Sequence, residues 1–161
     1  MSPTIKYGET FLADMSYYKT KSTSSDSNEP KRGEIIVYKH PEPGTDVLYY
    51  KRVIGVPGDI IETKDGFLTV NNQALKTSLK DSEAYKKISL LGGTYQEINH
   101  QGISYSVRRI PSHKRLHHLG RKRFVLRAKE YFVVGDNRDE TADSRNSGVV
   151  PLKNIYGRVV I

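Results

Sequence analysis

Short apolar clusters separated by turn residues are the feature that most limits how this chain can fold. The longest apolar runs, among them residues 47–50 and 131–134, are four residues long. A membrane-spanning helix needs about 18 consecutive apolar residues, so no run in this chain can cross a bilayer. Runs of this length that are rich in β-branched and aromatic residues are typical of strands. The pattern therefore predicts a mainly β protein.

Turn residues support this prediction. Pro57 and Gly58 suit the middle of a type II turn, because Pro fixes φ and Gly accepts a positive φ. Asp65 and Gly66 stand between two apolar clusters and are typical of a hairpin. Residues 75–91 are the one stretch whose pattern suits a helix. The predicted strands are residues 10–13, 35–38, 47–54, 59–62, 67–70, 123–126, 131–134 and 155–161.

Positive charge is concentrated in residues 105–129, called the basic segment below. The chain has a net charge of +8, and this segment holds nine basic residues and no acidic one. Such a segment attracts the phosphate groups of nucleic acid or of anionic lipid, although a solvated loop without a partner is the plain alternative. Aromatic residues are sparse in it, which disfavours stacking on bases. We therefore expect an anionic membrane surface as a partner and no nucleic acid.

No metal or other cofactor is predicted. The chain has no cysteine, which excludes disulfides and thiolate metal ligands. His113, His117 and His118 lie close together in the sequence, but Lys114 and Arg115 beside them oppose a bound cation. These histidines are more consistent with a solvated loop than with a metal site.

Lys51 is the first candidate catalytic residue. Side chains alternate along a strand, so Lys51 shares a face with Tyr49 and Val53, whereas Arg52 points to the other face. Burial among apolar neighbours lowers the pKa of a lysine and would leave a neutral amine able to accept a proton. Most strand lysines instead lay their stem on apolar surface and keep the charge in water. The position of Lys51 alone does not separate these two interpretations.

A dense polar segment, residues 135–145, follows the predicted strand at residues 131–134. It reads Gly-Asp-Asn-Arg-Asp-Glu-Thr-Ala-Asp-Ser-Arg. A turn needs only Gly, Asp or Asn. This concentration of acids, arginines and hydroxyl groups therefore indicates side chains that are positioned for a purpose.

Four segments, in this order, resemble the bacterial type I signal peptidases, which are serine/lysine endopeptidases. Residues 1–9, Met-Ser-Pro-Thr-Ile-Lys-Tyr-Gly-Glu, resemble the nucleophile box Ser-Met-x-Pro-Thr-Leu-x-x-Gly-Asp without its serine. Residues 32–38 resemble the Arg-Gly-Asp-Ile-Val-Val-Phe strand, and residues 50–59 resemble the lysine box. Residues 135–145, with residues 148–151, resemble the Gly-Asp-Asn-Arg-Asp box. The Gly-Asp-Asn motif alone is weak, but the ordered set is specific.

The resemblance implies a role for individual residues of the site. Lys51 corresponds to the general base of a Ser/Lys dyad. Thr141 stands where the family usually has a serine whose hydroxyl holds the lysine amine. Two ion pairs, Asp143 with Arg145 and Asp136 with Arg52, would brace the site. The positions that line the pockets for small substrate side chains are Met1, Ile5, Tyr49 and Tyr50.

The resemblance also implies a function and a location. Family members remove signal peptides from exported preproteins at the extracytoplasmic face of the bacterial cytoplasmic membrane. Met1 corresponds to the position directly after the catalytic serine, so we expect this chain to lack the nucleophile, the oxyanion hole and the N-terminal membrane anchor, and to be inactive as written. The expected partners are preprotein signal peptides.

The expected architecture is a signal-peptidase-like β fold. Both chain ends, residues 1–63 and 128–161, are predicted to form the catalytic core, and residues 64–127 are predicted to form a smaller inserted β-rich subdomain. Two other functions remain open at this point. The chain could be a relative of the self-cleaving repressors, which share the Ser/Lys chemistry, or a non-catalytic domain that binds peptide or lipid.

Overall fold

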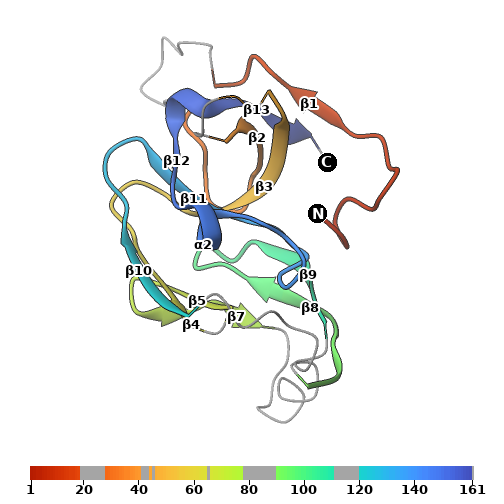
Figure 1. Cartoon of the computed structure of the whole chain (residues 1–161), viewed down its shortest axis with the longest axis vertical. Coiled ribbons are helices and arrows are strands. Elements are labelled where there is room, and N and C mark those ends of the chain that lie inside the picture. Colours follow the sequence, from red (N-terminus) through yellow and green to blue (C-terminus); the bar gives the residue numbers. More distant parts are fainter. Residues whose placement is uncertain are drawn as a thin grey trace.

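The computed structural model describes residues 1–18, 28–40, 44, 46–64, 66–77, 90–110 and 120–160. These residues form mainly antiparallel strands, which confirms the predicted fold class (Figure 1). Helical structure includes the short helix α2 (Ser144–Ser147) and the 3-10 turn η2 (Leu152–Asn154).

The largest sheet has six strands and is built from both parts of the chain that were predicted to form the core. Its order is β1-β13-β2-β3-β11-β12, and all neighbouring strands are antiparallel. The strands are β1 (Leu12–Asp14), β2 (Ile35–Lys39), β3 (Leu48–Gly55), β11 (Glu130–Val134), β12 (Val150–Pro151) and β13 (Ile155–Val160). The central strands are buried on both faces, which explains why their sequences are continuous apolar runs.

Two smaller sheets are formed by the chain between β3 and β11. The four-stranded sheet has the order β10-β4-β5-β6, and the three-stranded sheet has the order β7-β8-β9. The strands of the first are β4 (Ile60–Lys64), β5 (Phe67–Val70), β6 (Gln73–Ala74) and β10 (Arg121–Val125). Those of the second are β7 (Lys76–Thr77), β8 (Gly93–Ile98) and β9 (Ser104–Arg109).

Both predicted turns are consistent with the structure. The Asp59 amide donates to the Val56 carbonyl at 3.1 Å, and Gly58 has a φ of 90°, as a type II turn requires. Strands β4 and β5 pair as a hairpin whose turn includes Gly66, with a φ of 80°. Asp65 lies outside the described residues.

The three sheets share one hydrophobic core. Ile54 and Phe132 of the six-stranded sheet pack in the same buried cluster as Ile61 of the four-stranded sheet and Val107 of the three-stranded sheet. The chain leaves the six-stranded sheet between β3 and β4, which is a few residues before position 64. The division of the chain at residues 64 and 127 therefore stays a prediction, and the inserted part packs directly against the main sheet.

The helix predicted for residues 75–91 is wrong at its start and agrees with the structure at its end, where Leu90 and Leu91 are helical. Lys76 and Thr77 form β7, which pairs with β8. Residues 78–89 lie outside the described residues. The hairpin of β8 and β9 was not predicted from the sequence, although it supplies several of the contacts described below.

Candidate active site

Lys51 lies on β3, directly opposite Ile36 of β2. Val53 and Tyr49, two residues away on either side, belong to or pack against the buried cluster that contains Ile36. Lys51 is half-buried, and burial lowers the pKa of its amine below the ordinary value of 10.5. Asp143 opposes this shift by raising the pKa. The net effect is a lowered pKa, which a lysine needs in order to act as a general base near neutral pH.

The N-terminal residues reach the same place. Residues 1–5 form a turn, closed by a hydrogen bond from the Ile5 amide to the Met1 carbonyl at 3.1 Å. Burial lowers the pKa of the Met1 α-amino group, and the positive charge of Lys51 lowers it further, whereas Asp136 raises it. The backbone nitrogen of Met1 therefore lies within electrostatic reach of Lys51.

The predicted pair of Arg52 and Asp136 is present and buried. Arg52 Nε and Nη2 donate to the two carboxylate oxygens of Asp136 at 2.9 and 2.7 Å, which is the bidentate arrangement. Arg52 Nη1 also donates to the Gly33 carbonyl at 2.6 Å. Its guanidinium lies over the Tyr105 ring, 4.2 Å from the centroid. The pair fixes the start of the 135–145 segment against β3.

The second predicted pair, Asp143 with Arg145, is also present. Arg145 Nε and Nη2 donate to the Asp143 carboxylate at 2.9 and 2.8 Å, and the same carboxylate caps α2 by accepting from the Arg145 amide at 3.1 Å. The Gly135 amide donates to Asp143 at 3.1 Å. Asp143 thus joins both ends of the 135–145 segment, and its charge acts on Lys51.

Thr141 does not make the predicted contact. Among the described residues its hydroxyl donates to the Ala142 carbonyl at 3.4 Å, and no hydrogen bond joins it to Lys51. Its side chain packs against Gly135, where an added Cβ would lie 2.5 Å from the Thr141 methyl group. Packing against the Gly135 backbone holds Thr141 here, so its role toward Lys51 stays a prediction.

Three of the four predicted substrate-pocket residues lie together. Ile5 is buried, and Met1 and Tyr50 pack against the cluster to which it belongs. A cavity of about 270 Å³ adjoins this cluster and shares Ile35 and Val159 with it, but none of the four predicted pocket residues lines the cavity. Tyr49 lies in the other cluster, as strand alternation requires, so the structure does not bring it to the other three.

The structure adds residues that the sequence did not indicate. Glu97 of β8 accepts two hydrogen bonds from Arg138, at 2.8 and 2.5 Å, and a third from the Tyr105 hydroxyl at 2.9 Å. All three side chains are buried. Backbone hydrogen bonds from Arg108 to Asp136 and from Arg138 to Arg108, at 2.8 and 2.9 Å, dock β9 on the same segment.

The basic segment does not form one continuous surface. Arg109 is buried and pairs with Asp139 at 3.0 Å, because β9 packs inward at this position. Arg121 and Arg123 are exposed on β10. Residues 111–119, which include the three clustered histidines, lie outside the described residues. Within the described part of the chain, no group of three or more histidine, cysteine, aspartate or glutamate residues could hold a metal ion.

Comparisons with known proteins agree on one family. The sequence profile of the family described as signal peptidase, peptidase S26, matches residues 1–161. Signal peptidase I of Buchnera aphidicola subsp. Baizongia pistaciae is 31% identical, with 99% of this chain and 65% of that protein covered. Signal peptidase I of Pseudomonas aeruginosa is 31% identical, with 98% and 59% covered. Signal peptidase IB of Staphylococcus aureus is 31% identical, with 99% and 70% covered.

A solved structure of a signal peptidase I from Enterococcus faecalis V583 is also similar. It has 24% sequence identity and a TM-score of 0.47, and the match covers 82% of this chain and 97% of that one.

A half-buried lysine with a lowered pKa, braced by two buried ion pairs, is an arrangement suited to a hydrolase with a lysine base. The chain belongs to the signal peptidase family, peptidase S26. It spans 59% to 65% of the length of the Pseudomonas aeruginosa and Buchnera relatives. Among the described residues, no helix has the length and the apolar character that crossing a bilayer requires.

Proposed function

We propose that this chain is the catalytic region of a membrane-anchored signal peptidase that acts at the extracytoplasmic face of the bacterial cytoplasmic membrane. Lys51 would serve as general base, and a serine at the position before Met1 would serve as nucleophile. The observation that carries the proposal is that the N-terminal turn is joined to β3 beside the half-buried Lys51, through a hydrogen bond of 3.3 Å from Arg52 Nη2 to the Thr4 hydroxyl. The matched relatives are signal peptidases, which favours this function over that of a self-cleaving repressor or a non-catalytic domain.

The proposed reaction follows from this geometry. The serine Oγ attacks the scissile carbonyl carbon while the neutral Lys51 amine accepts the hydroxyl proton. Lys51 then protonates the leaving amine as the peptide bond breaks, which leaves an acyl-enzyme. A water molecule, deprotonated by Lys51, attacks this ester. The bond between the acyl carbon and the serine Oγ breaks, Lys51 returns the proton to Oγ, and the signal peptide leaves with a free carboxylate.

The two buried pairs support this chemistry indirectly. Asp136 and Asp143 both raise the pKa of Lys51, and Arg145 lowers it. Because each carboxylate is held by an arginine, its field at the lysine is fixed in position. Burial remains the largest influence on the pKa of the Lys51 amine. A larger fraction of this amine is therefore neutral at a given pH than for an exposed lysine.

The peptidase activity can be tested with a longer form of the protein that carries a serine before Met1. We expect this form to cleave a preprotein in detergent solution, and Lys51→Met to abolish cleavage while the protein stays folded. A serine-to-alanine variant at the added position is the matched control. Cleavage that persists in Lys51→Met would contradict the proposed role of the lysine.

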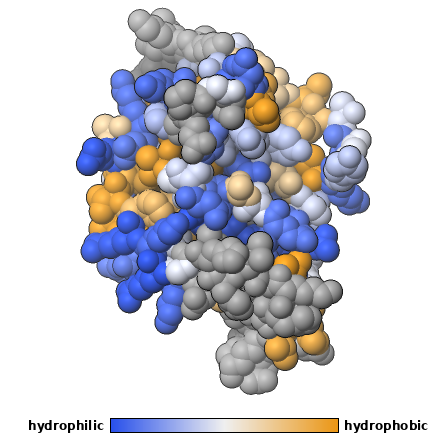
Figure 2. All heavy atoms as spheres, viewed as in Figure 1, coloured by the Kyte–Doolittle hydropathy of each residue, from blue (hydrophilic) through white to orange (hydrophobic). Residues whose placement is uncertain are grey.

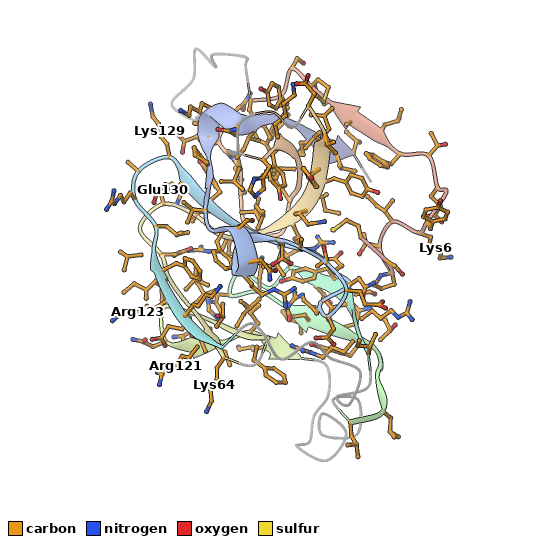
Figure 3. The ribbon with its side chains drawn as sticks, viewed as in Figure 1. Lys6, Lys64, Arg121, Arg123, Lys129 and Glu130 are labelled. Carbon is orange, nitrogen blue, oxygen red and sulfur yellow. The ribbon has the colours of Figure 1, made fainter. Side chains whose placement is uncertain are left out.

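We also propose that an anionic membrane surface contacts the outer face of the four-stranded sheet. Arg121 and Arg123 lie opposite Lys64 and Glu62 in the register of β10 and β4, so their side chains share this outer face. Figure 3 shows the arginines and Lys64 projecting at the same margin of the molecule. Within the described part of this face, Glu62 lies 4.0 Å from each arginine, and one carboxylate does not cancel the charge of three basic side chains.

An exposed apolar side chain accompanies these charges. Val125 of β10 is 62% exposed and follows the two arginines on the same side of the strand. Figure 2 shows hydrophilic and apolar side chains next to each other along this margin. Basic groups beside an exposed apolar group suit the headgroup region of an anionic bilayer.

Vesicle sedimentation tests this contact. We expect the chain to bind vesicles that contain phosphatidylglycerol and to bind pure phosphatidylcholine weakly, with binding reduced by salt. Arg121→Gln with Arg123→Gln should weaken binding by about 2 kcal/mol, since each basic residue near the surface contributes about 1 kcal/mol. The charge-matched control is Lys31→Gln with Lys153→Gln, on exposed lysines elsewhere. Equal losses in both double variants would show that only net charge matters.

A further inference from the structure

The Thr4 side chain lies where three parts of the structure meet. Its hydroxyl donates a hydrogen bond to Asp136 Oδ2 and accepts one from Arg52 Nη2 at 3.3 Å. The same oxygen lies 3.5 Å from the Ser106 carbonyl oxygen of β9. One hydroxyl therefore links the N-terminal turn, the buried ion pair and the β8–β9 hairpin.

The surroundings of Asp136 make this link specific. The side chain of Asp136 is fully buried, and each carboxylate oxygen already accepts a hydrogen bond from Arg52. A buried carboxylate has acceptor capacity for further donors, and bonds to a charged acceptor are stronger than neutral ones. Thr4 supplies such a donor from the turn that contains Met1.

The turn has one other strong attachment. Ile5 is 6% exposed and packs in a cluster with Ile35, Val37 and Val159. This apolar packing fixes how deep the turn sits but is non-directional. A hydrogen bond to a rigid carboxylate adds a direction, and Thr4 makes it four residues from the position that precedes Met1.

We propose that Thr4 is a positioning residue, which orients the N-terminal turn on the Arg52–Asp136 pair so that the residue preceding Met1 faces Lys51. The identity of that residue as the nucleophile rests on the proposed function, whereas the orientation of the turn does not. The hydroxyl of Thr4 contacts Asp136, Arg52 and Ser106, and among the described residues no hydrogen bond joins it to Lys51. It acts through the backbone of residues 1–5.

The kinetic test uses the longer form that carries a serine before Met1. Thr4→Val keeps the shape of the side chain and removes the hydroxyl, whereas Thr4→Ser keeps the hydroxyl. We expect Thr4→Val to lower kcat by roughly 10- to 100-fold with a smaller effect on KM, because a displacement of about 1 Å costs that much. Thr4→Ser should recover most of the activity. The control is Thr10→Val, at an exposed threonine of the same N-terminal stretch.

A second measurement does not depend on activity. The Ile5 amide closes the turn by donating to Met1, so its hydrogen exchange reports whether the turn is held. In the 161-residue chain, we expect Thr4→Val to accelerate exchange of the Ile5 amide by roughly tenfold or more, the factor for losing a hydrogen bond to a charged group. The amide of Val37 in β2 should exchange at an unchanged rate.

The two measurements separate the two proposals. If the longer form does not cleave preproteins, the proposed function fails, and the exchange of the Ile5 amide still tests Thr4. If Thr4→Val leaves that exchange unchanged, or if its kcat equals that of Thr10→Val, Thr4 does not position the turn. If Thr4→Ser is as impaired as Thr4→Val, the hydroxyl is not the responsible group.

Discussion

The ion pair between Glu97 and Arg138 provides a demanding test of how the β8–β9 hairpin is attached. The pair is bidentate, with distances of 2.8 and 2.5 Å, and the two side chains are 5% and 2% exposed. The Tyr105 hydroxyl donates to the same carboxylate. The Glu97 carboxylate therefore joins the β8–β9 hairpin to the 135–145 segment.

We expect Glu97→Gln to destabilise the protein by about 3–5 kcal/mol, because removing one partner leaves the other charge buried and uncompensated. The change keeps the length of the side chain, and the amide oxygen of glutamine can still accept from Tyr105. The free energy of unfolding of a domain is about 5–15 kcal/mol, so this single change removes a large part of it. Urea unfolding at neutral pH, with the midpoint and slope fitted separately, measures the loss.

A surface pair serves as the matched control. Lys39 Nζ and Asp46 Oδ1 lie 3.0 Å apart, but the Asp46 side chain is fully exposed. Asp46→Asn removes one charge at a similar distance, and we expect no measurable change in the free energy of unfolding because exposed pairs are solvated and screened. If Glu97→Gln costs no more than Asp46→Asn, the argument from burial is wrong. Replacing both Glu97 and Arg138 with Met should recover much of the loss.

Three further outcomes are expected. Folding lowers the pKa of Lys51, so the unfolded chain binds the proton more tightly than the folded protein does. Lys51→Met should therefore raise thermal stability at neutral pH. The difference in stability between the variant and the original protein should narrow as pH rises toward 10.5. Gly135→Ala should cost about 1–3 kcal/mol in urea unfolding, since the new methyl group would overlap Thr141. Ile61→Ala should cost about 2–5 kcal/mol if the sheets share one core, whereas Leu12→Ala, at an exposed position, should stay within about 0.5 kcal/mol.

The central strands of the main sheet could be predicted because both of their faces are buried, whereas the two-residue edge strand β12 (Val150–Pro151) was not predicted. In β2 and β11 nearly every side chain is buried, so both sequences are continuous apolar runs bounded by polar or turn residues. Lys51 could be placed on a face with Tyr49 and Val53 from alternation alone. The predicted ion pairs needed the family resemblance, since no local pattern joins Arg52 to Asp136.

The β8–β9 hairpin could not be predicted from its sequence because its inward positions carry charged groups. Glu97 and Arg109 face inward, and each is stabilised by a residue at least 30 positions away, Arg138 and Asp139 respectively. Buried charges interrupt the alternation of apolar and polar residues that marks a strand. The available signal was the pair Tyr105 and Val107, which alternate with polar neighbours.

The contribution of Thr4 was hidden for a different reason. A threonine between a proline and an isoleucine has many possible uses in a turn, and its sequence neighbours do not indicate a buried partner. Its role emerges only when Asp136, 132 residues away, is brought beside it. Contacts of this kind depend on the assembled sheet.

The place of β13 in the sheet has a consequence for the order of folding. This last strand lies between β1 and β2, with Leu12 paired to Val160 and Ile36 paired to Arg158. Its two neighbours are made early in synthesis but cannot be joined until β13 has left the ribosome. Pairings this distant in sequence close slowly. The six-stranded sheet should therefore be complete only after β13 has been synthesised, and β1, whose partner in this sheet is β13, should become protected from proteases only then.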